Sequence, residues 1–205
     1  MTRLQRSTAF LLGATLFVAA CHKAVPPAPP TPAATPARAP VSPATSRLAL
    51  KHGLDREAAS LHMTPKPLTV AELSKMPLPP DFKGALEDNQ DQRIGDFERQ
   101  VYSVNATIKS IQLRSDGDYY MEIEGPDGSK SVMEVPDPAL CKGSPLQASI
   151  AATRKALEAR YHPTTAKKEV NDAAILQGIG FYGPRGSQAG GRLMPGLGIT
   201  FKPVA

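Results

Sequence analysis

The chain has 205 residues, of which 41% are hydrophobic and 5% aromatic, and its formal net charge is +5 at pH 7. A basic balance predicts nucleic-acid binding when lysine and arginine cluster, but no dense basic run occurs here. Two cysteines exclude a framework of several disulfides. Composition therefore leaves the partner open.

Residues 1–20 have the pattern of a secretory signal peptide. Arg3 and Arg6 precede an apolar run that is too short to span a bilayer comfortably and ends on small residues. Its end, FVAACH at 17–22, resembles the lipobox of bacterial lipoproteins, in which signal peptidase cuts before the cysteine. We therefore predict that Cys21 is lipidated. The alternative is an ordinary cleaved signal with a coincidental cysteine, and both place the chain outside the cytoplasm.

The predicted anchor makes the membrane the first expected partner. Two or three acyl chains hold a protein stably, because each buried CH₂ contributes roughly 0.8 kcal/mol. In lipoproteins of this type, aspartate after the cysteine often marks retention in the inner membrane, and His22 stands there instead. The sequence thus predicts a protein of the cell envelope and favours the periplasmic face of the outer membrane. Loss of Arg3 and Arg6 with the signal lowers the net charge to +3.

Residues 21–46 are predicted to be the lipidated cysteine and a linker. From Ala24 to Ser46 the chain is mostly proline and alanine and cannot build a core. Proline favours extended polyproline II structure, which at about 3.1 Å per residue holds a domain roughly 70 Å from the membrane.

Residues 47–98 are predicted to form a helical or irregular extension. Apolar side chains at helical spacing predict one short helix within 47–63; they are Leu50, Leu54, Ala58 and Leu61. Prolines then interrupt the chain repeatedly, and the acidic stretch 87–96 has no apolar pattern. We interpret 64–97 as an extension or linker that becomes ordered on contact.

Residues 99–205 are predicted to be the globular domain. Alternating apolar residues predict a long strand over 102–113, bent by a bulge where the phase switches at Ile111. Two shorter strands follow over 119–124 and 132–135, each after a turn rich in aspartate and glycine.

A helix is expected next, starting at Ser144-Pro145 and ending before Pro163. Its apolar stripe comprises Leu146, Ile150, Leu157 and Tyr161. A fourth strand is predicted over 175–181, with Leu176 on the opposite face from its neighbours.

A glycine-rich loop is then expected over 183–196, followed by a fifth strand over 197–201. Three strands, a helix and two strands predict an all-β fold with one helix, namely a five-stranded OB-fold-like barrel. A β-sandwich fragment or an SH3-like barrel is the alternative.

Four motifs also carry a resemblance: DGDYY at 116–120, EVPDP at 134–138, GIGF at 178–181 and GLGITFKPV at 196–204. They resemble a family of uncharacterised secreted bacterial proteins that look OB-like and have a DGDYH-type motif and an ending like NGIELHPV. Tyr120 and Lys202 stand where that pattern has histidine. A histidine-based site of the relatives would therefore be missing here. The resemblance covers roughly 99–204 and implies a fold but no activity.

Few residues point to catalysis. His162 is expected to be a capping or surface residue at the helix end. Cys141, the thiol left once Cys21 is acylated, is expected to be small and buried, with intermolecular pairing or a reactive thiol as alternatives. The densest carboxylates, which calcium would accept as ligands, are Asp116, Asp118, Glu122 and Glu124. Turn and strand-face roles account for them, so we predict no metal site, no cofactor and no catalytic residue.

A binding role fits better. OB-folds bind ligands on strands two and three, beside the loops that join strands one to two and four to five. Aromatic rings suit stacking on sugars or bases, and guanidinium groups suit polar recognition. The predicted ligand-binding residues are Tyr120, Tyr182, Arg185 and Arg192. The alternative is that the tyrosines belong to the core or rim and that the loop is merely flexible.

The sequence therefore predicts a lipid-anchored envelope protein with an OB-like binding or interaction module. Glu122 and Glu124 on the expected binding strand oppose phosphate, so saccharide or another envelope protein is favoured over nucleic acid. A secreted nuclease-like hydrolase is the alternative, because staphylococcal nucleases also use an OB-type barrel, although fold alone does not transfer function. A structural spacer, or a partner of a translocation machine, is the third possibility.

Overall fold

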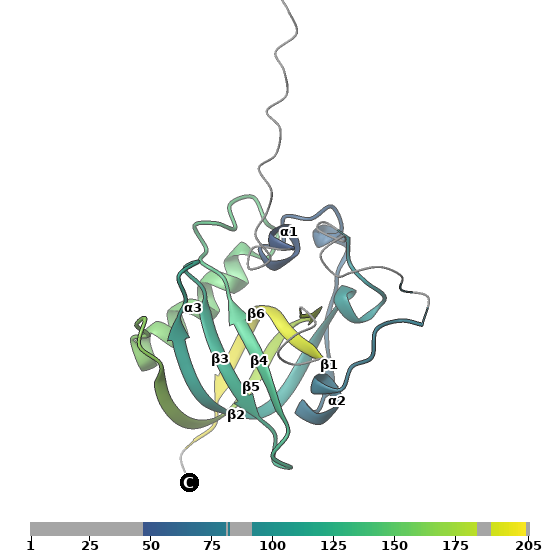
Figure 1. The fold of residues 1–205 in the computed structure, drawn as a ribbon. Coiled ribbons are helices and arrows are strands. Elements are labelled where there is room, and N and C mark those ends of the chain that lie inside the picture. Colours follow the sequence, from purple (N-terminus) through teal and green to yellow (C-terminus); the bar gives the residue numbers. More distant parts are fainter. Residues whose placement is uncertain (1–46, 81, 83–91, 184–189, 204–205) are drawn as a thin grey trace, which may run out of the picture. The chain divides into compact units, whose positions relative to one another are not determined.

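The structure is a computed structural model that describes residues 47–80, 82, 92–183 and 190–203. These residues form mostly sheet with few helices (Figure 1). The strands are β1 His62–Leu68, β2 Gln100–Leu113, β3 Tyr119–Glu124, β4 Lys130–Val135, β5 Lys168–Tyr182 and β6 Gly191–Phe201. The α-helices are α1 Leu48–Lys51, α2 Val70–Ser74 and α3 Gln147–Tyr161, and the 3₁₀ turns are η2 Ala58–Ser60 and η4 Phe97–Arg99.

The strands form one sheet in the order β1-β2-β3-β4-β6-β5, and β2 also pairs with β5. Five strands therefore close into a ring, because the order runs from β2 through β3, β4, β6 and β5 back to β2. Most pairs are antiparallel, but β4 and β6 run parallel, as do β1 and β2. The predicted all-β class with one longer helix is confirmed at this level.

The long strand β2 pairs with three neighbouring strands because it is bent. Its first part pairs with β1, its last part pairs with β3, and β5 runs along most of its other edge. The register shifts between Ile108 and Ser110 in both antiparallel ladders. The predicted bulge is thus confirmed, and it lies just before the change of phase at Ile111.

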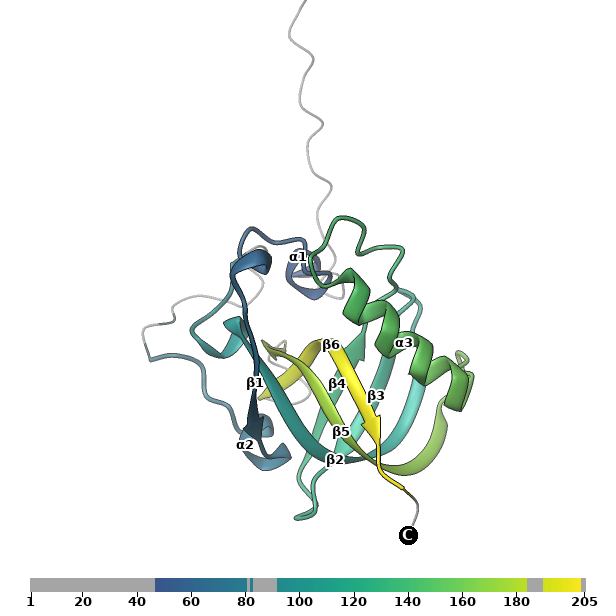
Figure 2. The ribbon, with the colours of Figure 1, turned by 180° about the vertical axis from the view of Figure 1, so that it is seen from behind.

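The shorter strands and the long helix bury the residues that the apolar periodicity of the sequence predicts. Tyr119, Met121 and Ile123 are buried and alternate with half-buried residues, as the sequence predicts for β3. The expected apolar stripe of α3 is buried, and the helix packs against β6 and β4 (Figure 2). It begins at Gln147 rather than at Pro145, because Ser144 Oγ accepts a hydrogen bond from the Leu146 N–H in a preceding turn.

The last two strands are longer than predicted. β6 already begins at Gly191, so the expected loop over 183–196 is wrong for its last six residues. In β5 the burial changes phase between Leu176 and Ile179, both wholly buried, because the register shifts around Gly178. The other buried side chains of the strand are Ala174, Phe181 and Tyr182. The sequence pattern did not predict the early start of β6 or the change of phase in β5, because glycine has no side chain and so interrupts the apolar alternation.

The segment before β2 is part of the fold and not a linker. β1 extends the sheet, and α2 starts with a capping box between Thr69 and Glu72. The predicted helix over 47–63 is wrong in extent, because α1 ends before Gly53, whose φ is +62°. Leu54 is consequently 47% exposed, although the other three residues of its predicted stripe are buried.

Buried ion pairs join this segment to the ring. The Glu98 carboxylate is wholly buried and accepts hydrogen bonds from the Arg47 guanidinium and from the Ile94 and Tyr182 N–H groups. Arg93 donates two hydrogen bonds to the carboxylate of Asp55, at 3.0 and 2.6 Å. Because burying an unpaired charge is costly, these pairs dictate how the segment lies.

No helix in the described part of the chain is long and apolar enough to cross a membrane.

We expect Glu98→Gln to lower the free energy of unfolding by about 3–5 kcal/mol, because it removes one charge of a buried ion pair and places an amide NH₂ where a carboxylate oxygen accepts the N–H group of Ile94 or Tyr182. Denaturant titration measures the change. Glu169→Gln is the matched control, because this glutamate is 70% exposed and its ion pair contributes about 1 kcal/mol or less. Equal effects of the two substitutions would contradict this assignment.

Candidate ligand-binding face

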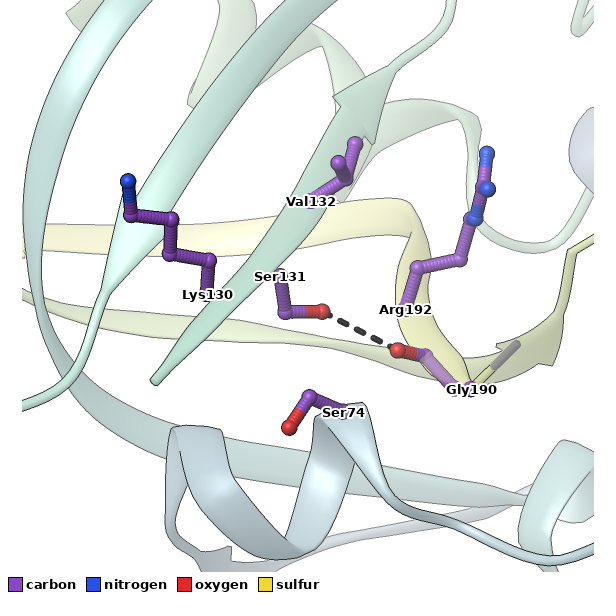
Figure 3. Close-up of a pocket in the computed structure, with 7 residues that line it drawn as sticks. Ser74, Lys130, Ser131, Val132, Gly190 and Arg192 are labelled. Atoms are coloured by element: carbon purple, nitrogen blue, oxygen red, sulfur yellow. Dashed lines mark hydrogen bonds between the residues drawn. The ribbon is translucent and has the colours of Figure 1, made fainter. Parts of the chain in front are cut away.

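Two hollows adjoin strand β4 and share the residues Lys130, Ser131 and Val132. The first has a volume of about 240 Å³ and is completed by Ser74 and the start of β6 at 190–192 (Figure 3). The second has a volume of about 380 Å³. Its further lining residues are Lys109, Tyr120, Glu122, Ile123, Glu124 and Glu169.

Strand alternation builds the surface between the hollows. The buried residues of β3 point into the ring, so Tyr120, Glu122 and Glu124 point outward. Their cross-strand partners on β4 are Glu134, Val132 and Lys130. These six side chains of β3 and β4 are called the outer face below. One aliphatic side chain, Val132, thus lies among polar neighbours and an aromatic ring.

Charges on and beside the outer face are paired. Lys167 Nζ lies 2.7 Å from Glu122 Oε2, and Ser110 Oγ donates a hydrogen bond to the same oxygen at 3.0 Å. Lys109 and Lys130 lie 3.8 and 4.0 Å from the two carboxylate oxygens of Glu124. Acidic and basic side chains therefore balance across this surface.

Tyr120, a predicted ligand-binding residue, lies on the outer face and lines the second hollow. The Arg114 guanidinium stacks on its ring, 4.1 Å from the centroid. The Glu134 backbone is its cross-strand partner. The ring is therefore held on one side by a cation and contributes its remaining surface to the hollow.

Arg192 also lines a hollow, but it belongs to strand β6 and not to a loop. Its Nη1 lies 3.4 Å from Glu134 Oε1. A side chain at position 183 would bring its Cβ within 2.5 Å of the Arg192 guanidinium, so Gly183 makes room for it. Figure 3 shows Lys130 and Arg192 on either side of Val132, with Ser131 Oγ hydrogen-bonded to the Gly191 carbonyl.

Tyr182, another predicted ligand-binding residue, does not join them. Tyr182 is a core residue that is only 5% exposed, with its ring packed on Phe97 and its hydroxyl donating to the Pro77 carbonyl at 2.8 Å. It offers no surface to a ligand, which corrects its assignment. Arg185 and Cys21 lie outside the described residues.

A second polar cluster, which sequence reasoning missed, lies beside the outer face. Lys51 Nζ lies 2.7 Å from Asp116 Oδ2, 2.5 Å from Asp118 Oδ2 and 3.4 Å from Glu134 Oε2. Asp116 Oδ1 also accepts the Asp118 N–H, which is the turn role expected from the sequence. The carboxylates of Asp116, Asp118 and Glu134 are called the cradle below. Nothing in the spacing of Lys51 pointed to a partner 65 residues away.

Burial and charge shift several pKa values in the cradle. Burial lowers the pKa of Lys51, but the charges of Glu134 and Asp118 outweigh it and the net shift is upward. Burial raises the pKa values of Asp118 and Glu134. Burial also raises the pKa of Asp116, but the hydrogen bond from Lys51, the charge of Lys51 and the backbone hydrogen bonds together outweigh it, so the pKa is lowered. The four groups therefore titrate as one coupled unit around the ammonium.

The remaining candidate residues, Cys141 and His162, have structural roles. Cys141 is buried as expected, its Sγ donates to the Asp137 carbonyl, and burial raises its pKa to about 11. His162 ends α3 with its side chain 78% exposed, as expected for a capping or surface residue. Within 47–203, apart from the segments not described, no group of three or more histidine, cysteine, aspartate or glutamate side chains is arranged to hold a metal ion.

Comparison of the chain with known protein families, with curated proteins and with solved structures finds no match.

We expect His52 to make stability depend on pH. Burial lowers its pKa, which the Asp118 charge offsets only in part. The unfolded chain therefore takes up this proton first, and stability is lost as pH falls through about 6.5, the ordinary value for histidine. Denaturant titration between pH 7.5 and 5.5 should show a smaller loss for His52→Gln than for the unsubstituted chain.

His162→Gln is the matched control and should keep the original pH dependence. Indistinguishable profiles for His52→Gln and the unsubstituted chain would contradict the expectation.

Proposed function

We propose that the chain is a lipid-anchored bacterial envelope protein whose ring of five strands is an OB-type barrel that binds saccharide on its outer face. The observation that carries the proposal is the pair of hollows that meet at Lys130, Ser131 and Val132. The second hollow lies on the second and third strands of the ring, where barrels of this type bind ligands, and the first lies between the third strand and the start of the fifth. No catalysis is invoked.

The ring supports the barrel assignment through its order of strands. Its first three strands form a meander, α3 lies between the third and fourth, and the third runs parallel to the fifth. This order closes the sheet without free edges within the ring. The resemblance to secreted OB-like proteins agrees with this assignment.

The balanced charges of the outer face favour a polar ligand that lacks a dense run of like charges. Tyr120 supplies aromatic surface, and the surrounding lysines and glutamates supply hydrogen-bond donors and acceptors. Because these charges balance, the face lacks the excess of cations that a phosphate backbone requires. A saccharide of the cell envelope fits these properties, and a peptidoglycan fragment is the first ligand to test.

The anchor rests on residues 17–22 and is tested separately. We expect Cys21→Ser to abolish incorporation of a fatty-acid label and to release the protein from the membrane fraction, because the thiol is the acylation site. Cys141→Ser is the matched control and should keep both label and membrane attachment. Labelling that survives in Cys21→Ser would overturn the lipoprotein assignment.

Binding is tested by calorimetry of the full chain in detergent with soluble peptidoglycan fragments. We expect Tyr120→Ala to weaken binding about tenfold, equivalent to about 1.4 kcal/mol, because the ring provides the contact surface. Tyr120→Phe should retain most of the affinity.

Tyr182→Phe is the matched control and should leave affinity unchanged, because its ring is buried. The proposal fails if no fragment binds saturably, or if Tyr120→Ala binds as tightly as the unsubstituted chain.

A further inference from the structure

We infer that the cradle of Asp116, Asp118 and Glu134 is a binding site for a primary ammonium group, and that Lys51 is its occupant from within the chain. This site shares Glu134 with the outer face, but the inference does not rest on saccharide binding.

The number and positions of the cradle's carboxylates suit an ammonium group. A protonated amine has three N–H donors and no acceptor. Lys51 Nζ lies within 3.4 Å of one oxygen from each of three carboxylates, which come from the turn before β3 and from β4. The contact with Asp116 Oδ2 is a hydrogen bond, and the carboxylates of Asp118 and Glu134 form ion pairs with the same ammonium, so there is one carboxylate for each N–H group.

The cradle holds more negative charge than its surroundings neutralise. Asp118 is wholly buried, and its Oδ1 accepts no hydrogen bond from any described residue. Arg192 lies 3.4 Å from the far oxygen of Glu134 and compensates that carboxylate in part. The charge of His52 also acts on Asp118. Without a cation, three carboxylates would share one buried site.

A hard divalent ion suits the cradle less well. Calcium takes six to eight oxygen ligands, whereas the cradle offers three carboxylates, one of which already faces a guanidinium. An ammonium group needs no more than the three acceptors present. Its aliphatic arm also suits the approach taken by the Lys51 side chain, which is only 8% exposed along its length.

Lys51, the occupant of the cradle, lies on a short helix. Lys51 is the last residue of α1, a helix of four residues, and the next glycine turns the chain away. Removal of the Lys51 side chain by substitution would leave the cradle without its occupant while the strands and turn that hold the carboxylates stay paired. The site would then accept an ammonium group from another molecule, such as a lysine side chain or an amino sugar.

The test removes the Lys51 ammonium by substitution and replaces it with an ammonium compound added to the solution. Lys51→Ala, made in the full chain in detergent, should lower the midpoint of thermal unfolding. Added n-butylammonium, which reproduces the arm and the charge of lysine, should recover at least half of that loss and should saturate. Tetramethylammonium, which has no N–H donor, and n-butanol, which has no charge, should recover none of it.

Two variants control the site. Lys51→Ala combined with Asp118→Asn should lose the recovery, because one carboxylate is gone. Lys109→Ala removes a lysine that is 39% exposed and should gain nothing from n-butylammonium. If Lys51→Ala does not fold unaided, we measure the yield of refolding with each additive instead of the midpoint of thermal unfolding. The yield must then be higher with n-butylammonium than with tetramethylammonium or n-butanol.

Two outcomes overturn the inference. Recovery by tetramethylammonium equal to that by n-butylammonium would show a general effect of salt. Calcium that stabilises Lys51→Ala more than n-butylammonium does would make the cradle a hard-cation site.

Discussion

The buried ion pair between Arg47 and Glu98 is the constraint on which the arrangement of the N-terminal segment depends. A carboxylate cannot be buried without compensation, and Glu98 receives it from segments far apart in the sequence: a guanidinium from before α1 and N–H groups from Ile94 and Tyr182. The pair therefore fixes α1 against the end of β5. Only from that position can Lys51 reach the cradle.

The cradle in turn connects the N-terminal segment with the candidate binding face. Glu134 contributes one oxygen to Lys51 and faces Arg192 with the other, while its backbone pairs with that of Tyr120. Both hollows are thus bordered by residues whose positions depend on the same carboxylate. Rigid support of this kind is what a binding site needs, because each side chain held in place before binding lowers the entropic cost of binding.

Sequence pattern predicted those parts of the fold in which side chains alternate or recur. The strands β3 and β4 and the stripe of α3 followed from apolar periodicity, and with them the outward position of Tyr120. Pattern failed where glycine and proline leave no periodicity, as at the start of β6 and in β1. It also could not pair Lys51 with Asp118 and Glu134, because ion pairs between distant residues leave no trace in local spacing. Prolines and the acidic stretch therefore led to the interpretation of 64–97 as an extension or linker, although Arg93 in this stretch forms a buried ion pair with Asp55.

The most direct test of the account is a titration of the ¹⁵N-labelled full chain in detergent with soluble peptidoglycan fragments, followed by backbone amide shifts. The account predicts saturable shifts at Tyr120, at 130–132 and at Arg192, with β1 unaffected. Saturable shifts confined to other parts of the chain, or the absence of any saturable shift, would contradict it.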